Sequence, residues 1–328
     1  MIRTLYRNGN GKIRTDLPLE SVKDLLALKS GTFWIDISGE EVAVSEPILR
    51  DIFDFHPLAI SDALEESHVP RVDDWGTYLY IVLHALAFDQ DQYEPLQTKE
   101  LDIFLGKNYL VTYQARKLEV VDRVWNMVQR DERFLDKGVD HLFYKLSDDL
   151  IADYLPLVDR MDAVMDEIED QVFDQPSQSL LERIFRMKRS LMHLRRTLAP
   201  LREVFNKLAR GDDQVIDKGD RVFFRDIYDH LVRLYDISES LRDLMGSVLD
   251  TYLSAINNRM NEVMKTLTII TTLFMPLSFV VGFFGMNFFI PPEPIGTLVT
   301  RPVFVWVLVA IVILPLIMFW WMRRRKWM

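Results

Sequence analysis

Residues that are polar, small or methionine recur every three or four positions along one stretch of the chain, and most of them offer an oxygen or sulfur atom. This polar stripe consists of Asp250, Ser254, Asn257, Asn261, Met264, Thr268, Thr271, Met275, Ser278 and Gly282. The spacing averages about 3.5 residues, the period of a left-handed coiled seam, so the residues share one face of a helix. The flanking positions are apolar, among them Ile269, Phe274 and Phe279. In lipid, such a polar face must contact either protein or water.

Two interpretations fit the polar stripe. Small and hydroxyl residues let membrane helices approach closely, so the stripe could be a helix–helix seam. It could also be the wall of a water-filled pore, and two features favour this. The stripe continues beyond the apolar stretch to Asn257 and Asp250, and one pair of helices is too few to enclose it. A pore would therefore need several chains, each contributing one stripe around an axis.

The element that carries the stripe is the first of two uncharged stretches. No charged residue lies between Lys265 and Glu293, and none lies between Arg301 and Arg323. Each stretch exceeds the roughly 20 helical residues that cross a hydrocarbon layer of ~30 Å. We therefore expect a two-helix membrane hairpin. The basic run from Arg323 to Lys326 predicts that both termini are cytoplasmic, because basic residues concentrate on that side of a membrane. The chain would then be a multi-pass protein of the cell inner (plasma) membrane.

Upstream of the membrane helices, the pattern indicates an α/β domain followed by helices. Runs rich in β-branched and aromatic residues predict strands at 32–37, 78–86, 100–105 and 109–113, and helical spacing runs from Ser45 to Glu66. From Leu118 onward only helical patterns remain. The predicted fold class is thus an α+β membrane protein. Its expected regions, in chain order, are an α/β domain (1–116), a helical region (117–220), a stalk helix (221–265), a transmembrane helix (266–286), an external loop (287–301), a second transmembrane helix (302–322) and a basic tail (323–328).

Composition excludes several classes of protein. The 328 residues include no cysteine, which rules out thiolate metal sites and cysteine nucleophiles. The formal net charge of -10 argues against nucleic acid as a partner, because phosphates require a basic surface. No nucleophile elbow, zinc-hydrolase motif or dinucleotide fingerprint occurs, so we do not expect an enzyme.

Several motifs together resemble the CorA family of divalent-cation channels. Gly285-Met286-Asn287 closes the first membrane helix, and upstream of it lie Asp250-Thr-Tyr-Leu-Ser, Asn261-Glu-Val-Met-Lys and Phe274-Met-Pro-Leu-Ser-Phe. Upstream of the membrane helices, His56-Pro57-Leu58 with Asp62, Pro70-Arg71-Val72 and Phe224-Arg225-Asp226 match as well. The resemblance covers nearly the whole chain.

This resemblance implies a homopentameric funnel that transports Mg²⁺, with the membrane lipid and other copies of the chain as partners. It implies a selectivity filter at Gly285, Met286 and Asn287, with Asn287 forming the external ring. Asn261, Met264, Leu267, Met275 and Ser278 match pore positions, and Asp250 matches an acidic residue at the inner mouth. Glu293 matches the external loop. The chain departs from the family at Phe284, where tyrosine is common.

The resemblance also implies regulatory Mg²⁺ bound between subunits by Asp62 and Asp226, with Asp148 as a further ligand. Falling cytosolic Mg²⁺ would empty these sites and open the pore. From the residues alone, Asp62 equally suits a helix-surface acid and Asp226 a salt-bridge partner. Two alternatives to a Mg²⁺ channel stay open: a family relative that transports Zn²⁺, Co²⁺ or Ni²⁺, and a membrane-anchored scaffold. An anchor would need no polar stripe.

Overall fold

The structure is a computed structural model of the chain. It describes all residues except 10, 28–30, 67–68, 90, 93–94, 132, 175, 212, 287–300 and 326–328. The chain divides into two compact units, Met1–Asp250 (unit 1) and Thr251–Met328 (unit 2).

Unit 1 contains a seven-stranded sheet in the order β2-β1-β3-β7-β6-β5-β4. The strands are β1 (Ile2–Arg7), β2 (Ile13–Thr15), β3 (Thr32–Ser38), β4 (Arg71–Asp74), β5 (Tyr78–Phe88), β6 (Leu96–Gly106) and β7 (Tyr109–Gln114). β3 and β7 pair in parallel, and the other neighbours pair antiparallel. The four predicted strands are confirmed. β4 was not among the predicted strands, because its residues are too polar to show a strand pattern.

One face of the sheet is covered by short helices: α1 (Leu19–Ala27), α2 (Val42–Pro47), the π-helical turn η1 (Ile48–Ile52) and α3 (Pro57–Leu64). The helical pattern over 45–66 therefore forms separate pieces. Asp54 has a positive φ of 55°, which interrupts the helix, and the His56 imidazole caps α3 by accepting from the Leu58 N–H at 3.2 Å. The buried core on this side includes Phe33, Phe55 and Phe104.

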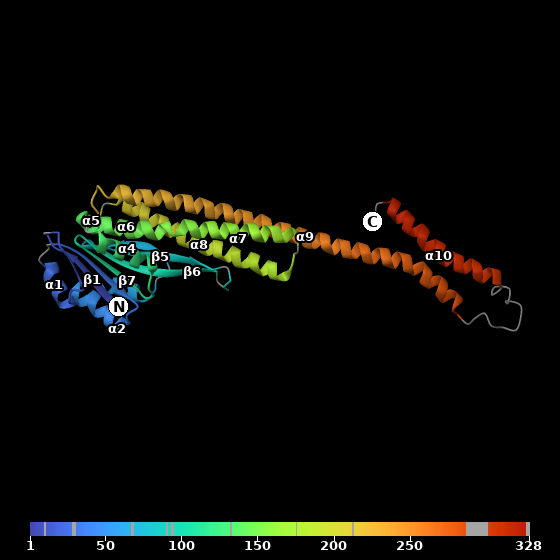
Figure 1. Cartoon of the computed structure of the whole chain (residues 1–328), viewed down its shortest axis with the longest axis horizontal. Helices are drawn as coiled ribbons and strands as arrows, with labels where there is room; N and C mark the ends of the chain where they lie inside the picture. Colours follow the sequence, from blue (N-terminus) through green and yellow to red (C-terminus); the bar gives the residue numbers. More distant parts are fainter. Residues whose placement is uncertain are drawn as a thin grey trace. The chain divides into compact units, whose positions relative to one another are not determined.

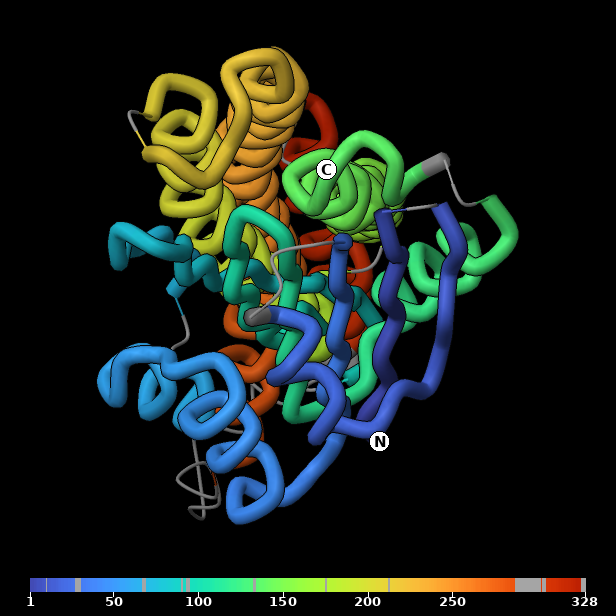
Figure 2. Tube along the Cα trace, turned by 90° about the vertical axis from the view of Figure 1, so that its left-hand side faces the viewer, coloured from blue at the N-terminus to red at the C-terminus, as the bar shows by residue number. Residues whose placement is uncertain are grey.

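Longer helices follow in the chain: α4 (Glu119–Arg130), α5 (Arg133–Asp136), α6 (Val139–Ala152), α7 (Tyr154–Asp174), α8 (Gln178–Arg210) and α9 (Arg221–Phe284). Figures 1 and 2 show α6, α7, α8 and the first part of α9 grouped on the side of the sheet away from α1 to α3. The predicted change from an α/β region to helices alone is confirmed.

In unit 1, α9 buries one row of side chains at alternating spacings of three and four residues. This buried seam consists of Phe224, Ile227, Leu231, Leu234, Ser238, Leu241, Met245 and Val248. The ring of Phe224 lies 5.4 Å from Phe143 of α6 and 6.4 Å from Phe205 of α8. At one side of the seam, Arg195 Nε lies 3.0 Å from Glu239 Oε1. The seam therefore fixes which side of α9 faces α6 and α8.

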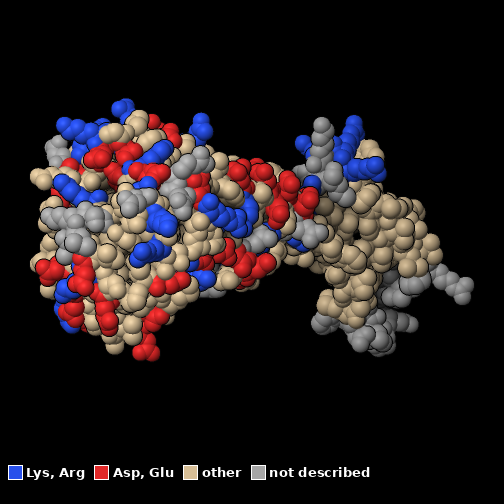
Figure 3. All heavy atoms as spheres, turned by 60° about the vertical axis from the view of Figure 1, so that its left-hand side comes forward, with Lys and Arg blue, Asp and Glu red and all other residues tan. Residues whose placement is uncertain are grey.

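Unit 2 contains the rest of α9 and α10 (Arg301–Arg324). Both helices contain segments long and apolar enough to cross a membrane. On the face that Figure 3 shows, charged side chains crowd unit 1 but are sparse on unit 2, where a basic group remains. Arg323 and Arg324 are basic residues in the last turn of α10. Unit 2 thus has the surface of a membrane-embedded segment.

Candidate functional site

The polar stripe lies exposed on α9 in a single chain. Asn257, Asn261, Met264, Thr268, Thr271, Met275 and Ser278 are all exposed, as is Leu267. The structure therefore places these predicted residues on one continuous helix. Nothing within the described part of the chain buries them, so a covering for this face has to come from other molecules.

The hydroxyl groups near the start of the apolar stretch donate within the helix itself. Thr268 Oγ1 donates to the Met264 carbonyl at 2.8 Å, and Thr266 Oγ1 donates to the Glu262 carbonyl at 2.9 Å. Each donor is thus used, but each oxygen keeps lone pairs that can accept another hydrogen bond. Water bound to a cation directs its hydrogens outward, so an acceptor of this kind suits a hydrated cation.

An aspartate row extends the stripe into unit 1. Asp229, Asp236, Asp243 and Asp250 are spaced by seven residues, and Asn257 continues the series. All four aspartates are exposed, and a helix repeat near 3.5 residues puts them roughly opposite the buried seam. Sequence reasoning identified only Asp250, although the seven-residue spacing could have revealed the others. The row offers negative charge on the face of α9 that does not pack on unit 1.

α9 ends at Phe284, and Gly285 follows it directly. The Gly285 N–H donates to the Val281 carbonyl at 2.9 Å. A Cβ atom at this glycine would lie only 3.0 Å from the same carbonyl oxygen, so a larger residue would press on the helix end. Met286 is exposed. The other predicted residues of this region, Asn287 and Glu293, lie outside the described residues.

The predicted regulatory carboxylates lie on three helices. Asp62 of α3 forms an ion pair with Arg71, with 2.6 Å between Oδ2 and Nη2. Asp148 of α6 lies 3.1 Å from Lys145 Nζ. Asp226 of α9 is exposed. Burial raises the pKa of the Tyr144 hydroxyl, and the negative charges of Asp148 and Asp226 add to this, so both carboxylates lie near that ring.

A single chain does not assemble these carboxylates into a metal site. Among the residues that the structure describes, no three histidine, aspartate or glutamate side chains gather closely enough to hold a metal ion. Asp226 is exposed, and the side chains of Asp148 and Asp62 are 28% and 46% exposed. Oxygen ligands of this type suit Mg²⁺. They fit a metal only if two copies of the chain bring them together.

A second group of titratable side chains is buried within the β5–β6 ladder. The Tyr80 hydroxyl donates to Asp102 Oδ1 at 2.6 Å. His84 lies four residues after Tyr80 on β5, and its Nε2 is 3.5 Å from Oε2 of Glu100, which lies two residues before Asp102 on β6. Burial raises the pKa of Asp102 well above its usual range, and the neighbouring Glu100 raises it further. Burial and the neighbouring Glu100 therefore both favour the protonated form of Asp102.

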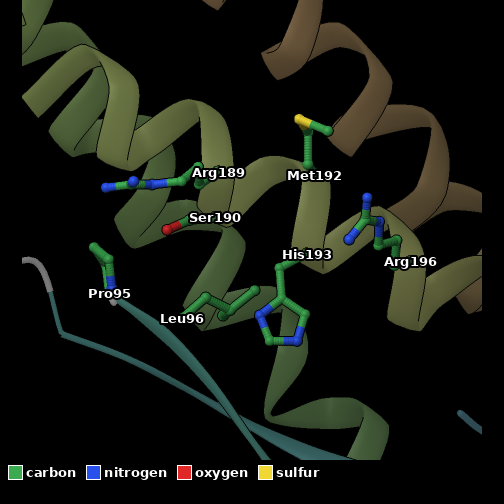
Figure 4. A pocket seen from close by; sticks show the side chains of 7 residues that line it. All are labelled: Pro95, Leu96, Arg189, Ser190, Met192, His193 and Arg196. Atoms are coloured by element: carbon green, nitrogen blue, oxygen red, sulfur yellow. The ribbon is translucent and has the colours of Figure 1, made fainter. Parts of the chain in front are cut away.

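A cavity of about 560 Å³ lies between α8 and the start of β6. It is lined by Arg189, His193 and Arg196 together with Leu96 and Pro95. Figure 4 shows the two arginine side chains extending to opposite sides. Such a positive lining repels divalent cations, and its charged groups do not converge on one point.

Comparison with known proteins decides the family. The model for CorA-like Mg²⁺ transporter proteins matches residues 29–324. The chain belongs to the CorA family. The resemblance predicted from the motifs is confirmed, and with it the membership of a family of membrane transporters rather than of enzymes.

Two relatives and one solved structure illustrate this membership. The cobalt/magnesium transport protein CorA of Thermotoga maritima is 35% identical over 296 residues, which is 90% of this chain and 83% of that protein. The putative metal ion transporter YfjQ of Bacillus subtilis is 36% identical over 261 residues, 80% of each chain. The CorA magnesium transporter structure from Methanocaldococcus jannaschii matches with a TM-score of 0.82 at 23% identity, covering 99% of this chain and 98% of that one. The CorA fold is thus shared: an N-terminal α/β domain, a long helix and two apolar C-terminal helices.

Proposed function

We propose that the chain is a divalent-cation channel that favours Mg²⁺ and mediates its influx across the plasma membrane. The observation that carries this proposal is the polar stripe, exposed along a helix long enough to span a membrane. A helix that merely anchored unit 1 would need no row of amide and hydroxyl groups. Because one chain leaves the stripe uncovered, the pore requires several copies, and membership of the CorA family supports a homopentamer with cytoplasmic termini.

In this proposal, α9 of each subunit lines the pore. The Asn287 ring would receive the hydrated ion at the external end, with Gly285 and Met286 shaping the turn and Glu293 in the external loop. Met264, Leu267 and Met275 would form apolar constrictions that close the pore by losing water. Asp250 and the rest of the aspartate row would attract the cation at the inner end. The membrane potential supplies ~2.3 kcal/mol per charge per 100 mV for inward movement.

The ligand chemistry of the stripe favours Mg²⁺ over transition metals. Mg²⁺ is reluctant to lose its waters, and neutral oxygens accept hydrogen bonds from those waters without replacing them. Zn²⁺, Co²⁺ and Ni²⁺ bind better to sites that offer thiolate or imidazole. The chain has no cysteine, and none of its six histidines falls in the stripe.

Regulation would come from Mg²⁺ bound between unit 1 of neighbouring subunits. Asp62 of one subunit and Asp226 of the next, with Asp148 as a further ligand, would repel one another until a divalent cation bridges them. Occupied sites would hold the closed packing, and falling cytosolic Mg²⁺ would release it. The exposure of Asp226 and the partial exposure of the other two support this role.

Ion flux into liposomes tests the proposed channel. Uptake of Mg²⁺, Co²⁺, Ni²⁺ and Zn²⁺ would be compared for the wild type and Asn287→Ala over a range of internal Mg²⁺. We expect Mg²⁺ uptake by the wild type, inhibition by internal Mg²⁺, and loss of ion preference in the variant. Absence of any wild-type flux would favour an anchor, and faster Zn²⁺ uptake would favour a zinc-transporting relative.

The regulatory assignment needs its own test. Asp62→Ala combined with Asp226→Ala should abolish inhibition by internal Mg²⁺ while flux at low Mg²⁺ persists. Inhibition that stays at its wild-type concentration in this double variant would refute the assignment of the sensor without affecting the pore.

A further inference from the structure

We propose that Arg71 competes with the regulatory cation for Asp62 and thereby sets the Mg²⁺ concentration at which the site fills. This inference rests on the proposed regulatory role of Asp62. It adds Arg71 as a residue that determines the Mg²⁺ sensitivity of the site, because its positively charged guanidinium group lies beside the carboxylate that would bind the metal.

The guanidinium group of Arg71 lies between two carboxylates. Its Nη2 is 2.6 Å from Asp62 Oδ2, and its Nε is 3.3 Å from Asp73 Oδ2. Arg71 and Asp73 are two residues apart on β4, so both side chains emerge on the same face of that strand. The guanidinium carbon is also 5.6 Å from the ring centroid of Tyr80 on the adjacent strand β5. Arg71 therefore has a second carboxylate within reach and an aromatic ring that supports its position.

The contacts of Arg71 are close in distance but poor in direction. The Nε and Nη2 atoms are both buried from solvent, yet neither makes a hydrogen bond of acceptable geometry. Charge attraction alone thus holds the guanidinium group against Asp62. An aligned, bidentate arginine–carboxylate pair would be considerably stronger. A contact of this poorer kind can be exchanged for another at small cost.

Solvent reaches the same carboxylate from the other side. The Asp62 side chain is 46% exposed, whereas the Arg71 side chain is 35% exposed. A divalent cation that approached Asp62 would meet a carboxylate whose charge is already balanced, and Arg71 would repel the cation. If the guanidinium group moved fully onto Asp73, Asp62 would become available. The Mg²⁺ affinity of the site would then reflect this exchange as well as the ligands themselves.

Four variants of the full-length protein in detergent test the exchange: Arg71→Gln, Arg71→Lys, Asp73→Asn and the double variant Arg71→Gln/Asp73→Asn. The probe is MgCl₂ alone, and the readout is protection of unit 1 from a protease as Mg²⁺ is raised. Protection reports binding independently of ion flux. Asp74→Asn is the matched control, because it removes one acidic charge from the same strand and keeps an acceptor for the Gly76 N–H, at 2.7 Å from Asp74 Oδ1.

Removal of the competing cation should shift the Mg²⁺ midpoint downward. We expect about a three- to tenfold lower midpoint for Arg71→Gln, the size expected for a partly exposed charge pair. Arg71→Lys keeps the charge and should stay within about twofold of the wild type. Asp73→Asn leaves Arg71 only Asp62 as a partner, so its midpoint should rise. In the Arg71→Gln background, Asp73→Asn should not change the midpoint further, because there is no guanidinium group left to exchange between Asp62 and Asp73.

Several results would overturn the inference. An unchanged or higher midpoint for Arg71→Gln would show that Arg71 only supports the fold. If Asp73→Asn raised the Mg²⁺ midpoint equally with and without Arg71, the change would be a general charge effect. The same would follow if Asp74→Asn raised the midpoint as much as Asp73→Asn does. If Arg71→Gln lowered the melting temperature without Mg²⁺, its midpoint could not be interpreted by itself. The test would then rest on the other two variants, an almost unchanged midpoint for Arg71→Lys and a raised midpoint for Asp73→Asn, and failure of either would overturn the inference. Mg²⁺ protection that survives unchanged in Asp62→Ala would instead refute the proposed regulatory site.

Discussion

Replacing Asp102 with asparagine should change how the stability of unit 1 depends on pH. Asp102 is 2% exposed on β6, and its carboxyl accepts the Tyr80 hydroxyl at 2.6 Å. Burial, helped by the nearby Glu100, raises the pKa of this acid well above its ordinary value of 3.8. The folded chain therefore holds a proton at Asp102 that the unfolded chain releases. An asparagine keeps the shape and the acceptor oxygen but has no proton to lose.

Linkage between protonation and folding gives the size and the sign of the effect. Between the unfolded and the folded pKa of Asp102, the folded state binds one more proton than the unfolded state. The free energy of unfolding of the wild type therefore falls by about 1.4 kcal/mol for each pH unit of increase. The loss ends once the pH passes the folded pKa. Asp102→Asn lacks this contribution, so it should gain about 1.4 kcal/mol relative to the wild type for each pH unit between the unfolded and the folded pKa of Asp102.

Denaturant unfolding of the full-length protein in detergent, followed by tryptophan fluorescence at pH 5, 6 and 7, measures this difference. Asp24→Asn, an exposed site on α1, is the control for loss of one negative charge. A difference between variant and wild type that stays constant across these pH values would mean that Asp102 is ionised in the folded protein. The argument from burial would then be wrong.

Further predictions concern packing and the ion pathway. Phe224→Ala empties a buried position between Phe143 and Phe205 and should cost about 3–5 kcal/mol in the free energy of unfolding, whereas Val222→Ala at an exposed position should cost under about 0.5 kcal/mol. Tyr154→Phe removes the hydroxyl that donates to the buried His84 carbonyl and should cost about 1–2 kcal/mol in the same assay. The double variant Asp236→Asn/Asp243→Asn should lower divalent-cation flux about two- to tenfold at low salt and much less at high salt, because salt screens exposed charges. An equal reduction of flux at both salt concentrations would contradict a role of the aspartate row in attracting ions.

Most of the fold could be predicted because its elements have strong local patterns. The β-branched and aromatic runs of β3, β5, β6 and β7 and the long apolar spacing of α9 are visible without tertiary context. β4 could not be predicted, since Arg71-Val72-Asp73-Asp74 forms a strand only through its pairing with residues 79–82. The same holds for the break at Asp54, where the chain adopts a positive φ that no local signal announces.

In the candidate site, too, features that depend on local spacing could be predicted, whereas features that depend on tertiary packing could not. Residues of the polar stripe depend only on spacing along one helix, so sequence alone placed them on a common face, and the aspartate row was within reach of the same reasoning. The contact between Asp62 and Arg71 could not be predicted in this way, because it joins a helix to a strand, α3 to β4, and depends on their tertiary packing. Similarly, the approach of Asp148 and Asp226 to Tyr144 depends on how α6 packs against α9.

The buried seam has a mechanical consequence for any opening of the pore. Turning α9 about its own axis by a single residue position, about 100°, would carry Phe224 and Ile227 out of the core and into solvent. The segment from Phe224 to Val248 therefore cannot work as a rotating shaft. In the proposed channel, a change in pore diameter would instead come from movement of α9 together with the helices it packs on, or from bending beyond that segment. Pro276 provides a place for such a bend, because its missing N–H leaves the Thr272 carbonyl without a helical donor.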